Sequence, residues 1–285
     1  MQSENKTVET NGTRIEATTT GSGFDHASHK NFYDYYAKES QTVEAYGRFS
    51  RVRDTVLRIY GKGRPVTQQL QMADVGCGAG TQSLVWAEVG HVVHALDVNE
   101  PLLELGRKRA AERGFKVDFQ VGTATKLPWA DESMDICIAL ELIEHVADWQ
   151  SCVNEFARVV KPGGILYMTT SNCLCPKQQE FTLPLYSWYP GKWKRRYEKA
   201  AVTTRPELAN YALYPAVNWF SFYELQSYLA KKGFRSLDRF QMMDTSNKGL
   251  AAKVVVGAIR SNPLLRFFGQ VCTEGTMILS IKDRS

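Results

Sequence analysis

The sequence of 285 residues lacks any apolar run near the roughly 18 residues that a membrane-spanning helix needs. Its first residues, M-Q-S-E-N-K, lack the apolar core of a secretory signal peptide. Its six cysteines include no C-x-x-C pair, and several fall in apolar segments, so we expect reduced thiols. These absences favour a cytoplasmic protein.

The composition is that of a soluble globular chain. Hydrophobic residues make up 44% and charged residues 23% of the sequence. The length fits one large domain with an elaboration better than two independent domains. The net charge of +5 is unevenly placed, because residues 176–205 hold seven Lys or Arg and two Glu, which alone gives +5.

The most informative stretch is L-Q-M-A-D-V-G-C-G-A-G, residues 70–80. A short apolar segment leads to an acid and then to glycine at alternate positions, and a helical pattern follows from Thr81. Glycine removes the Cβ atoms that would hold a ligand away from the backbone, and it allows positive φ angles. Strand, glycine turn and helix are the parts of a nucleotide-binding first βα unit.

A second apolar segment, G-H-V-V-H-A-L-D-V, ends in Asp97, about 20 residues beyond the glycines. A carboxylate there can accept hydrogen bonds from both hydroxyls of a ribose. The spacing G-x-G-x-G differs from the G-x-G-x-x-G of dinucleotide enzymes. D-V-G-C-G-A-G instead resembles motif I of the class I methyltransferases, which bind S-adenosylmethionine (SAM). K-P-G-G before an apolar strand, at 161–164, is a second mark of that family.

The resemblance implies which residues bind SAM. Gly76, Gly78 and Asp97 would hold the cofactor. Thr123 stands where the family usually has an acid near the adenine, so adenine contact would rest more on the backbone near Ala124. The implied set is Asp74, Gly76, Cys77, Gly78, Gly80, Asp97, Val98, Thr123, Ala124 and Leu140.

A second polar group, E-L-I-E-H-V, follows the expected fourth strand, at the edge where open α/β sheets bind ligands. Its two carboxylates and imidazole could hold a divalent cation such as Mg²⁺ or position one acid–base pair. The E-x-x-E-H pattern is similar to the metal-binding motif of the ubiquinone-biosynthesis O-methyltransferases. That similarity implies catalytic and metal-binding roles for Glu141, Glu144 and His145. A His145 base without metal and a structural role are left open by the residues alone.

The elements expected along the chain give an α/β fold. The resemblance implies a Rossmann-like class I methyltransferase fold, with a seven-stranded, doubly wound, mostly parallel sheet. The predicted parts are a disordered tail (1–29), an N-terminal helical lid (30–68), a SAM-binding core (69–172), a basic-aromatic insertion after the fifth strand (173–219) and a C-terminal helix with closing strands (220–285). Residues 234–243 and 252–259 read as the closing strands, and the segment from Asn262 as a short helix or a surface contact.

The sequence therefore predicts a SAM-dependent methyltransferase acting on a hydroxyl of a small aromatic or lipid-like molecule. The alternatives are carbon methylation of a quinone or sterol-like ring, RNA methylation through the basic insertion, and SAM-binding regulation without turnover. The absence of an N-P-P-Y-type motif after the fourth strand argues against amino-directed base methylation. Cations interleaved with aromatics in residues 176–205 suit an anionic, partly apolar surface, and they favour a peripheral membrane contact.

Overall fold

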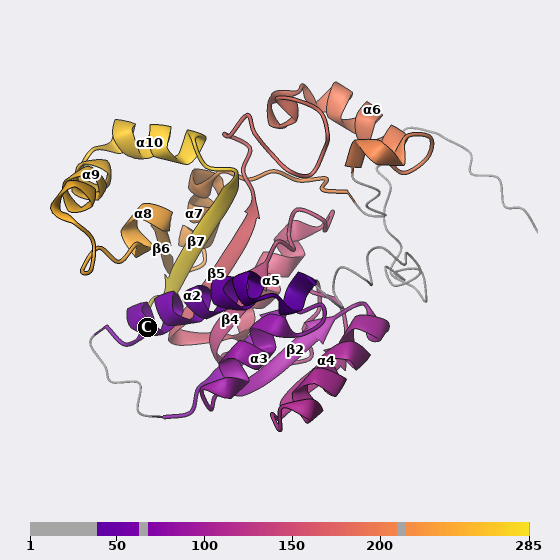
Figure 1. The fold of residues 1–285 in the computed structure, drawn as a ribbon, viewed down its shortest axis with the longest axis vertical. Helices are drawn as coiled ribbons and strands as arrows, with labels where there is room; N and C mark the ends of the chain where they lie inside the picture. Colours follow the sequence, from indigo (N-terminus) through magenta and orange to yellow (C-terminus); the bar gives the residue numbers. More distant parts are fainter. Residues whose placement is uncertain (1–38, 63–67, 210–214, 285) are drawn as a thin grey trace, which may run out of the picture.

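The computed structural model describes residues 39–62, 68–209 and 215–284 (Figure 1). The predicted tail and the first part of the predicted lid lie outside these ranges. In chain order the elements are η2 (Glu39–Gln41), α2 (Val43–Tyr60), β1 (Gln71–Val75), α3 (Thr81–Glu88), β2 (Val92–Asp97), α4 (Glu100–Glu112), β3 (Val117–Val121), β4 (Met134–Leu140), α5 (Trp149–Val159), β5 (Val160–Ser171), η3 (Tyr186–Trp188), α6 (Gly191–Ala201), η4 (Pro206–Ala209), α7 (Phe222–Ala230), β6 (Phe234–Asp238), α8 (Arg239–Met242), α9 (Leu250–Ser261), α10 (Pro263–Val271) and β7 (Gly275–Lys282). No described helix is long and apolar enough to cross a membrane.

The seven strands form one sheet in the order β3-β2-β1-β4-β5-β7-β6. Neighbouring strands from β3 to β5 pair in parallel, whereas β7 pairs antiparallel with both β5 and β6. The chain order reverses between β1 and β4, so the carboxyl ends of these strands border the crevice where doubly wound sheets bind ligands. The predicted seven-stranded, mostly parallel sheet is confirmed.

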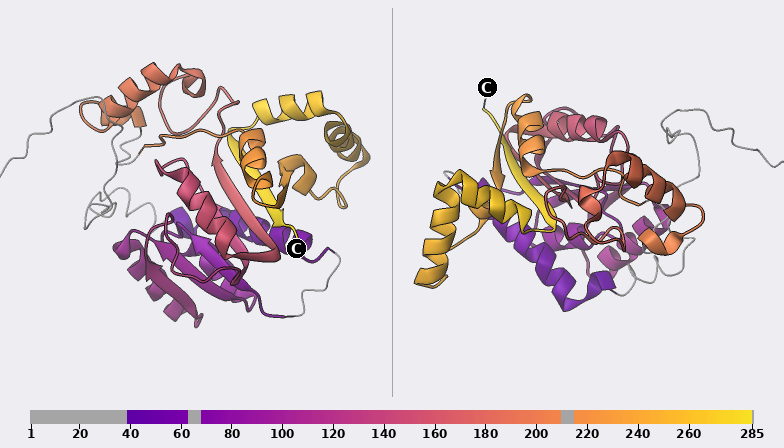
Figure 2. Two further views of the ribbon diagram at one scale, coloured as in Figure 1. Left: turned by 180° about the vertical axis from the view of Figure 1, so that it is seen from behind. Right: turned by 90° about the horizontal axis from the view of Figure 1, so that it is seen from above.

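Helices cover both faces of the sheet because the central strands are apolar on both sides. In β4, Ile136 and Ile138 pack in the cluster that includes α2 and α3, whereas Cys137 and Ala139 pack in the cluster that includes α5 and α7. This alternation is the two-residue period of a strand. Figure 2 shows α5 on the face opposite to α2 and α3.

Side-chain caps set the starts of α5 and α7. The Asp148 carboxylate accepts a hydrogen bond from the Ser151 amide at the start of α5, and the Ser221 hydroxyl accepts one from the Glu224 amide at the start of α7. Each cap satisfies a backbone N–H that has no partner within the first turn of its helix. Helix α5 ends at Val159, just before the K-P-G-G stretch.

The prediction of a closing strand at 252–259 is wrong. These residues belong to α9, and the closing strand is β7, from the segment for which we expected a helix or a surface contact. A short apolar run does not distinguish a strand from a helix by periodicity. The β7 run, G-T-M-I-L-S-I-K, lies between β5 and β6, where Ile278 and Leu279 are fully buried.

The insertion is a small folded unit that includes η3, α6 and η4. Phe181, Tyr186 and Leu208 are buried in its own apolar cluster, and the Phe181 and Tyr186 rings stack with centroids 4.1 Å apart. Several of the predicted surface aromatics therefore stabilise the insertion itself. Trp188 and Trp193 remain exposed beside its cations.

Candidate functional site

The glycine loop joins β1 to α3 through left-handed backbone conformations. Gly76, Gly78 and Gly80 have φ angles of 74°, 52° and 74°. Such angles are strained for any residue with a Cβ atom. A Cβ on Gly80 would also lie 2.7 Å from the ring of Phe119, so this glycine allows β3 to approach the loop.

The Asp97 carboxylate fixes this loop against the end of β2. Its Oδ2 accepts a hydrogen bond of 2.8 Å from the Gly78 amide, and its Oδ1 accepts one of 2.9 Å from the Asn99 amide. Burial raises the pKa of Asp97, while these backbone donors oppose that rise. A carboxylate has about four lone-pair sites, so it keeps acceptor capacity beside the backbone donors of Gly78, Val98 and Asn99. Asp97 can therefore hold the loop and still accept hydrogen bonds from a ligand.

Asp74 lies beneath the loop. Its side chain is buried, and its Oδ2 accepts a hydrogen bond of 2.5 Å from the Ser83 hydroxyl in the first turn of α3. Burial raises the pKa of Asp74 to about 7, with a smaller contribution from the negative charge of Asp97. This placement suits a residue that positions the loop, and its role in cofactor binding stays a prediction.

The other predicted cofactor residues lie around the carboxyl ends of β1 to β4. Gly122, after β3, donates from its amide to the Asp97 carbonyl, which brings the next loop beside β2. In that loop, the Thr123 and Thr125 hydroxyls are 2.9 Å apart, and Ala124 is buried. The remaining members are half-buried Cys77, exposed Val98 and half-buried Leu140.

Glu141 and Glu144 follow β4 in different environments. Glu141 is exposed, has a φ angle of 47°, and donates from its amide to the Thr169 carbonyl. Glu144 is fully buried and accepts a hydrogen bond of 2.9 Å from the Thr170 hydroxyl. Burial raises the pKa of Glu144 well above its ordinary value, and the nearby Glu141 carboxylate raises it further. The other Glu144 oxygen, Oε1, is buried, and the polar side chain that interacts with this carboxyl besides Thr170 is Glu141.

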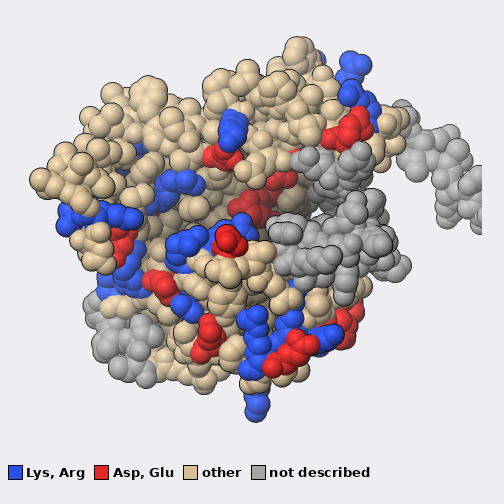
Figure 3. All heavy atoms as spheres, in the orientation of Figure 1, with Lys and Arg blue, Asp and Glu red and all other residues tan. Residues whose placement is uncertain are grey.

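The structure brings together a different set of possible metal ligands from the one that the sequence suggested, because Glu180 of the insertion takes the place of Glu141. Possible ligand atoms of Glu144, His145 and Glu180 all lie within 4.8 Å of one another. Glu141 is not part of this group. The Ser171 hydroxyl, at the end of β5, donates to Glu180. Figure 3 shows acidic side chains in the middle of this face, below the insertion.

Sequence reasoning missed Glu180 because it lies 35 residues after His145 and outside any motif. The sequence did contain one indication. Glu180 is one of two acidic residues in the segment 176–205, which holds seven Lys or Arg. Folding brings it to the site because the insertion is anchored to the core. The Val217 and Asn218 amides donate to the Glu144 carbonyl, and the Asn218 side chain donates to the Val146 carbonyl.

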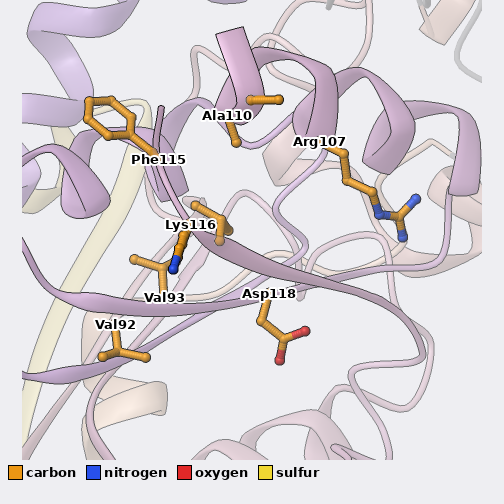
Figure 4. Close-up of a pocket in the computed structure, with 9 residues that line it drawn as sticks. Val92, Val93, Arg107, Ala110, Phe115, Lys116 and Asp118 are labelled. Atoms are coloured by element: carbon orange, nitrogen blue, oxygen red, sulfur yellow. The ribbon is translucent and has the colours of Figure 1, made fainter. Parts of the chain in front are cut away.

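A separate hollow of about 430 Å³ lies at the other end of the sheet (Figure 4). It is bordered by Val92 and Val93 at the start of β2, and by Phe115 and Lys116 before β3. The glycine loop and Asp97 lie at the opposite end of these strands. This hollow is therefore separate from the candidate site.

Residues 73–168 match the family model described as a methyltransferase domain. This match runs from Ala73 in β1 to Met168 in β5, and includes the glycine loop, Asp97 and the E-x-x-E-H motif. The sheet order and the matched domain together define the core as a class I methyltransferase fold. The resemblance expected from the motifs is confirmed.

Among curated proteins, the chain is similar to ubiquinone biosynthesis O-methyltransferases. It is 34% identical to that of Sinorhizobium medicae over 128 residues, which are 44% of this chain and 52% of the relative. It is 30% identical to that of Brucella anthropi over 176 residues, which are 60% of this chain and 62% of the relative. The chain thus spans between half and two thirds of the length of these relatives.

Solved structures confirm the fold. The magnesium protoporphyrin IX methyltransferase of Synechocystis PCC 6803, with bound S-adenosylhomocysteine (SAH), has a TM-score of 0.53 and 13% identity, over 91% of this chain and 96% of that one. The YcgJ protein of Bacillus subtilis has a TM-score of 0.51 and 17% identity, over 82% of this chain and 100% of that one.

Proposed function

We propose that this chain is a SAM-dependent methyltransferase that methylates a hydroxyl of a small aromatic or lipid-like molecule. The observation that carries the proposal is Asp97, which holds the glycine loop within a matched methyltransferase domain and keeps lone pairs for a ligand. The similarity to ubiquinone biosynthesis O-methyltransferases supports a hydroxyl as the acceptor. A cytoplasmic location remains part of the proposal.

The residues present fit SAM. Gly76 and Gly78 leave backbone without Cβ atoms at the end of β1, and the Asp97 carboxylate faces the same loop. When bound there, the cofactor supplies a methyl group that its sulfonium already activates. The protein's contribution is then mainly to position the acceptor and to take its proton.

Two arrangements at Glu144 and His145 could assist loss of the hydroxyl proton. A neutral His145 imidazole could accept it directly. Alternatively, Glu144, His145 and Glu180 could hold Mg²⁺, and carboxylate oxygens are the ligands that this ion prefers. The burial of the Glu144 carboxyl beside the Glu141 carboxylate favours the second arrangement, because a bound cation would stabilise the charged form of Glu144.

Calorimetric titration with SAM and SAH tests the proposal directly. We expect both to bind with dissociation constants on the order of micromolar, because they share the ribose and the amino-acid portion that the loop would hold. SAH formation with catechol as the probe acceptor then measures turnover. Failure of both ligands to bind would contradict the methyltransferase proposal as a whole.

A pair of glutamate variants distinguishes the two possible metal sets. We expect Glu180→Gln to weaken Mg²⁺ binding at least about tenfold in calorimetry, because it removes one charged ligand. Glu141→Gln is the comparison variant, since Glu141 lies outside the group; because its carboxylate raises the pKa of Glu144, its loss should not weaken Mg²⁺ binding. The reverse pattern would support the set expected from the sequence. Absence of Mg²⁺ binding to the unsubstituted protein would leave His145 acting without metal.

The exposed Trp188 and Trp193 support a peripheral membrane contact through residues 176–205, beside the exposed cations of α6. Aromatic and cationic side chains suit the headgroup region of an anionic bilayer. A lipid-like acceptor would then reach the site from the membrane surface.

A further inference from the structure

Helices α9 and α10 form a hairpin between β6 and β7 that displays a broad apolar surface. Asn262 alone separates the two helices, and its side chain caps α10. Six large apolar side chains on the hairpin are at least 45% exposed, namely Leu250, Val254, Val255, Leu264, Leu265 and Phe268. Soluble monomers rarely leave contiguous apolar patches of more than a few hundred Å² without a partner.

The opposite side of the hairpin is already packed on the domain. Val256 is buried, and the Arg260 guanidinium donates to the Phe240 carbonyl in α8. Arg266 lies 3.6 Å from the buried carboxylate of Asp238. A Cβ on Gly269 would lie 2.6 Å from the Phe240 ring, so α10 rests closely on that ring. The inner contacts fix the hairpin, and its exposed apolar side chains therefore belong to its folded arrangement.

The charge on this segment shows which partner fits. Residues 248–271 contain four Lys or Arg and no Asp or Glu, which gives +4. Arg260 and Arg266 are engaged with the Phe240 carbonyl and the Asp238 carboxylate, whereas Lys248 and Lys253 are exposed beside the apolar surface. Two copies of this face would bring like charges together across an apolar contact. An anionic lipid surface complements both the charge and the apolar side chains.

The position of the hairpin agrees with this partner. In Figure 1, α10 and the insertion with α6 lie along the same edge of the molecule, beyond the carboxyl end of β5. The right view of Figure 2 shows the hairpin and the insertion standing out on opposite sides of that edge. Figure 3 shows few charged side chains over α9 and α10.

We propose that the α9–α10 hairpin is a lipid-binding surface that docks the protein on anionic bilayers, through exposed side chains separate from those of residues 176–205. The proposal rests on the hairpin itself and does not depend on methyl transfer. With the insertion, it provides two contacts on one edge, which would fix the orientation of the protein on a membrane.

Co-sedimentation with phosphatidylcholine vesicles, with and without phosphatidylglycerol, tests the hairpin at low and high salt. We expect Leu264→Gln with Phe268→Gln to weaken binding to the phosphatidylglycerol vesicles at least about tenfold, because both side chains lose their apolar contact with lipid. High salt should weaken binding by the unsubstituted protein without abolishing it, since the apolar contact persists. The matched control, Val43→Gln with Val89→Gln, removes two exposed apolar side chains outside the hairpin and should bind normally.

Trp188→Gln with Trp193→Gln compares the hairpin with the insertion. The proposal would be overturned if the hairpin variant bound vesicles as well as the unsubstituted protein does. It would also be overturned if only the tryptophan variant lost vesicle binding. Analytical ultracentrifugation provides a further test. A dimer that dissociates only in the hairpin variant, with no vesicle binding, would assign the surface to a second copy. Calorimetric SAM binding should be normal in every variant, which separates this test from that of the proposed function.

Discussion

Asp97→Asn is expected to weaken SAM binding about 1,000-fold, or about 4 kcal/mol, because hydrogen bonds to a charged group contribute about 1.5–3 kcal/mol each. Both Asp97 oxygens accept backbone N–H groups, from Gly78 and from Asn99. An asparagine can accept only one of these bonds, since its amide nitrogen would face the other N–H. The variant therefore loses part of the loop attachment as well as the charge offered to the ribose.

Calorimetry with SAM measures this effect against two controls. Asp97→Glu keeps the carboxylate on a longer side chain, and we expect it to lose about tenfold in affinity. Asp118→Asn removes a carboxylate that is exposed on neighbouring β3, and it should bind SAM normally. An Asp97→Asn affinity close to that of the unsubstituted protein would show that the ribose is held elsewhere.

Asp74→Asn is expected to remove a dependence of stability on pH. The unfolded chain releases the Asp74 proton near its ordinary pKa of 3.8, whereas burial raises the pKa in the folded protein to about 7. Between these values the folded state binds more protons, so its free energy of unfolding falls as the pH rises. We expect ionisation of Asp74 to lower the free energy of unfolding by about 3 kcal/mol as the pH rises from about 5 to about 8.

Urea unfolding across that pH range measures the difference. The asparagine variant can still accept the Ser83 hydrogen bond through its side-chain oxygen, but it has no proton to release. Its stability should exceed that of the unsubstituted protein increasingly as the pH rises. Glu112→Gln, which changes an exposed carboxyl on α4, should leave the original pH dependence in place. Parallel pH curves for the Asp74 variant and the unsubstituted protein would rule out this explanation.

Local patterns predicted the sheet because each βα step carries its own turn and cap. The glycine loop, Asp97 and the caps at Asp148 and Ser221 act within a few residues of their positions in the chain. The three successive valines in α9 favoured a strand because β-branched residues are common in strands. No local pattern showed that residues 275–282 would occupy the place between β5 and β6.

The candidate site likewise contains residues that local sequence patterns could predict and a residue that they could not. The positions around Asp97 follow from one turn and the end of the next strand, so spacing alone could place them together. Glu180 reaches Glu144 and His145 only because the insertion has its own core and anchors beside the E-x-x-E-H motif. A contact between two separately folded parts leaves no periodic pattern in the sequence.

The position of β7 has a consequence for the order in which the chain folds. This strand pairs with β5 more than 100 residues earlier in the chain, and it separates β5 from β6. During synthesis, β1 to β5 can assemble first, but β5 keeps an unpaired edge until residues 275–282 have left the ribosome. Such an edge is a template for pairing with other chains, and long-range pairing is slow to form. The nascent chain is therefore most prone to aggregate in the interval after the insertion and the apolar hairpin have been synthesised and before β7 pairs with β5.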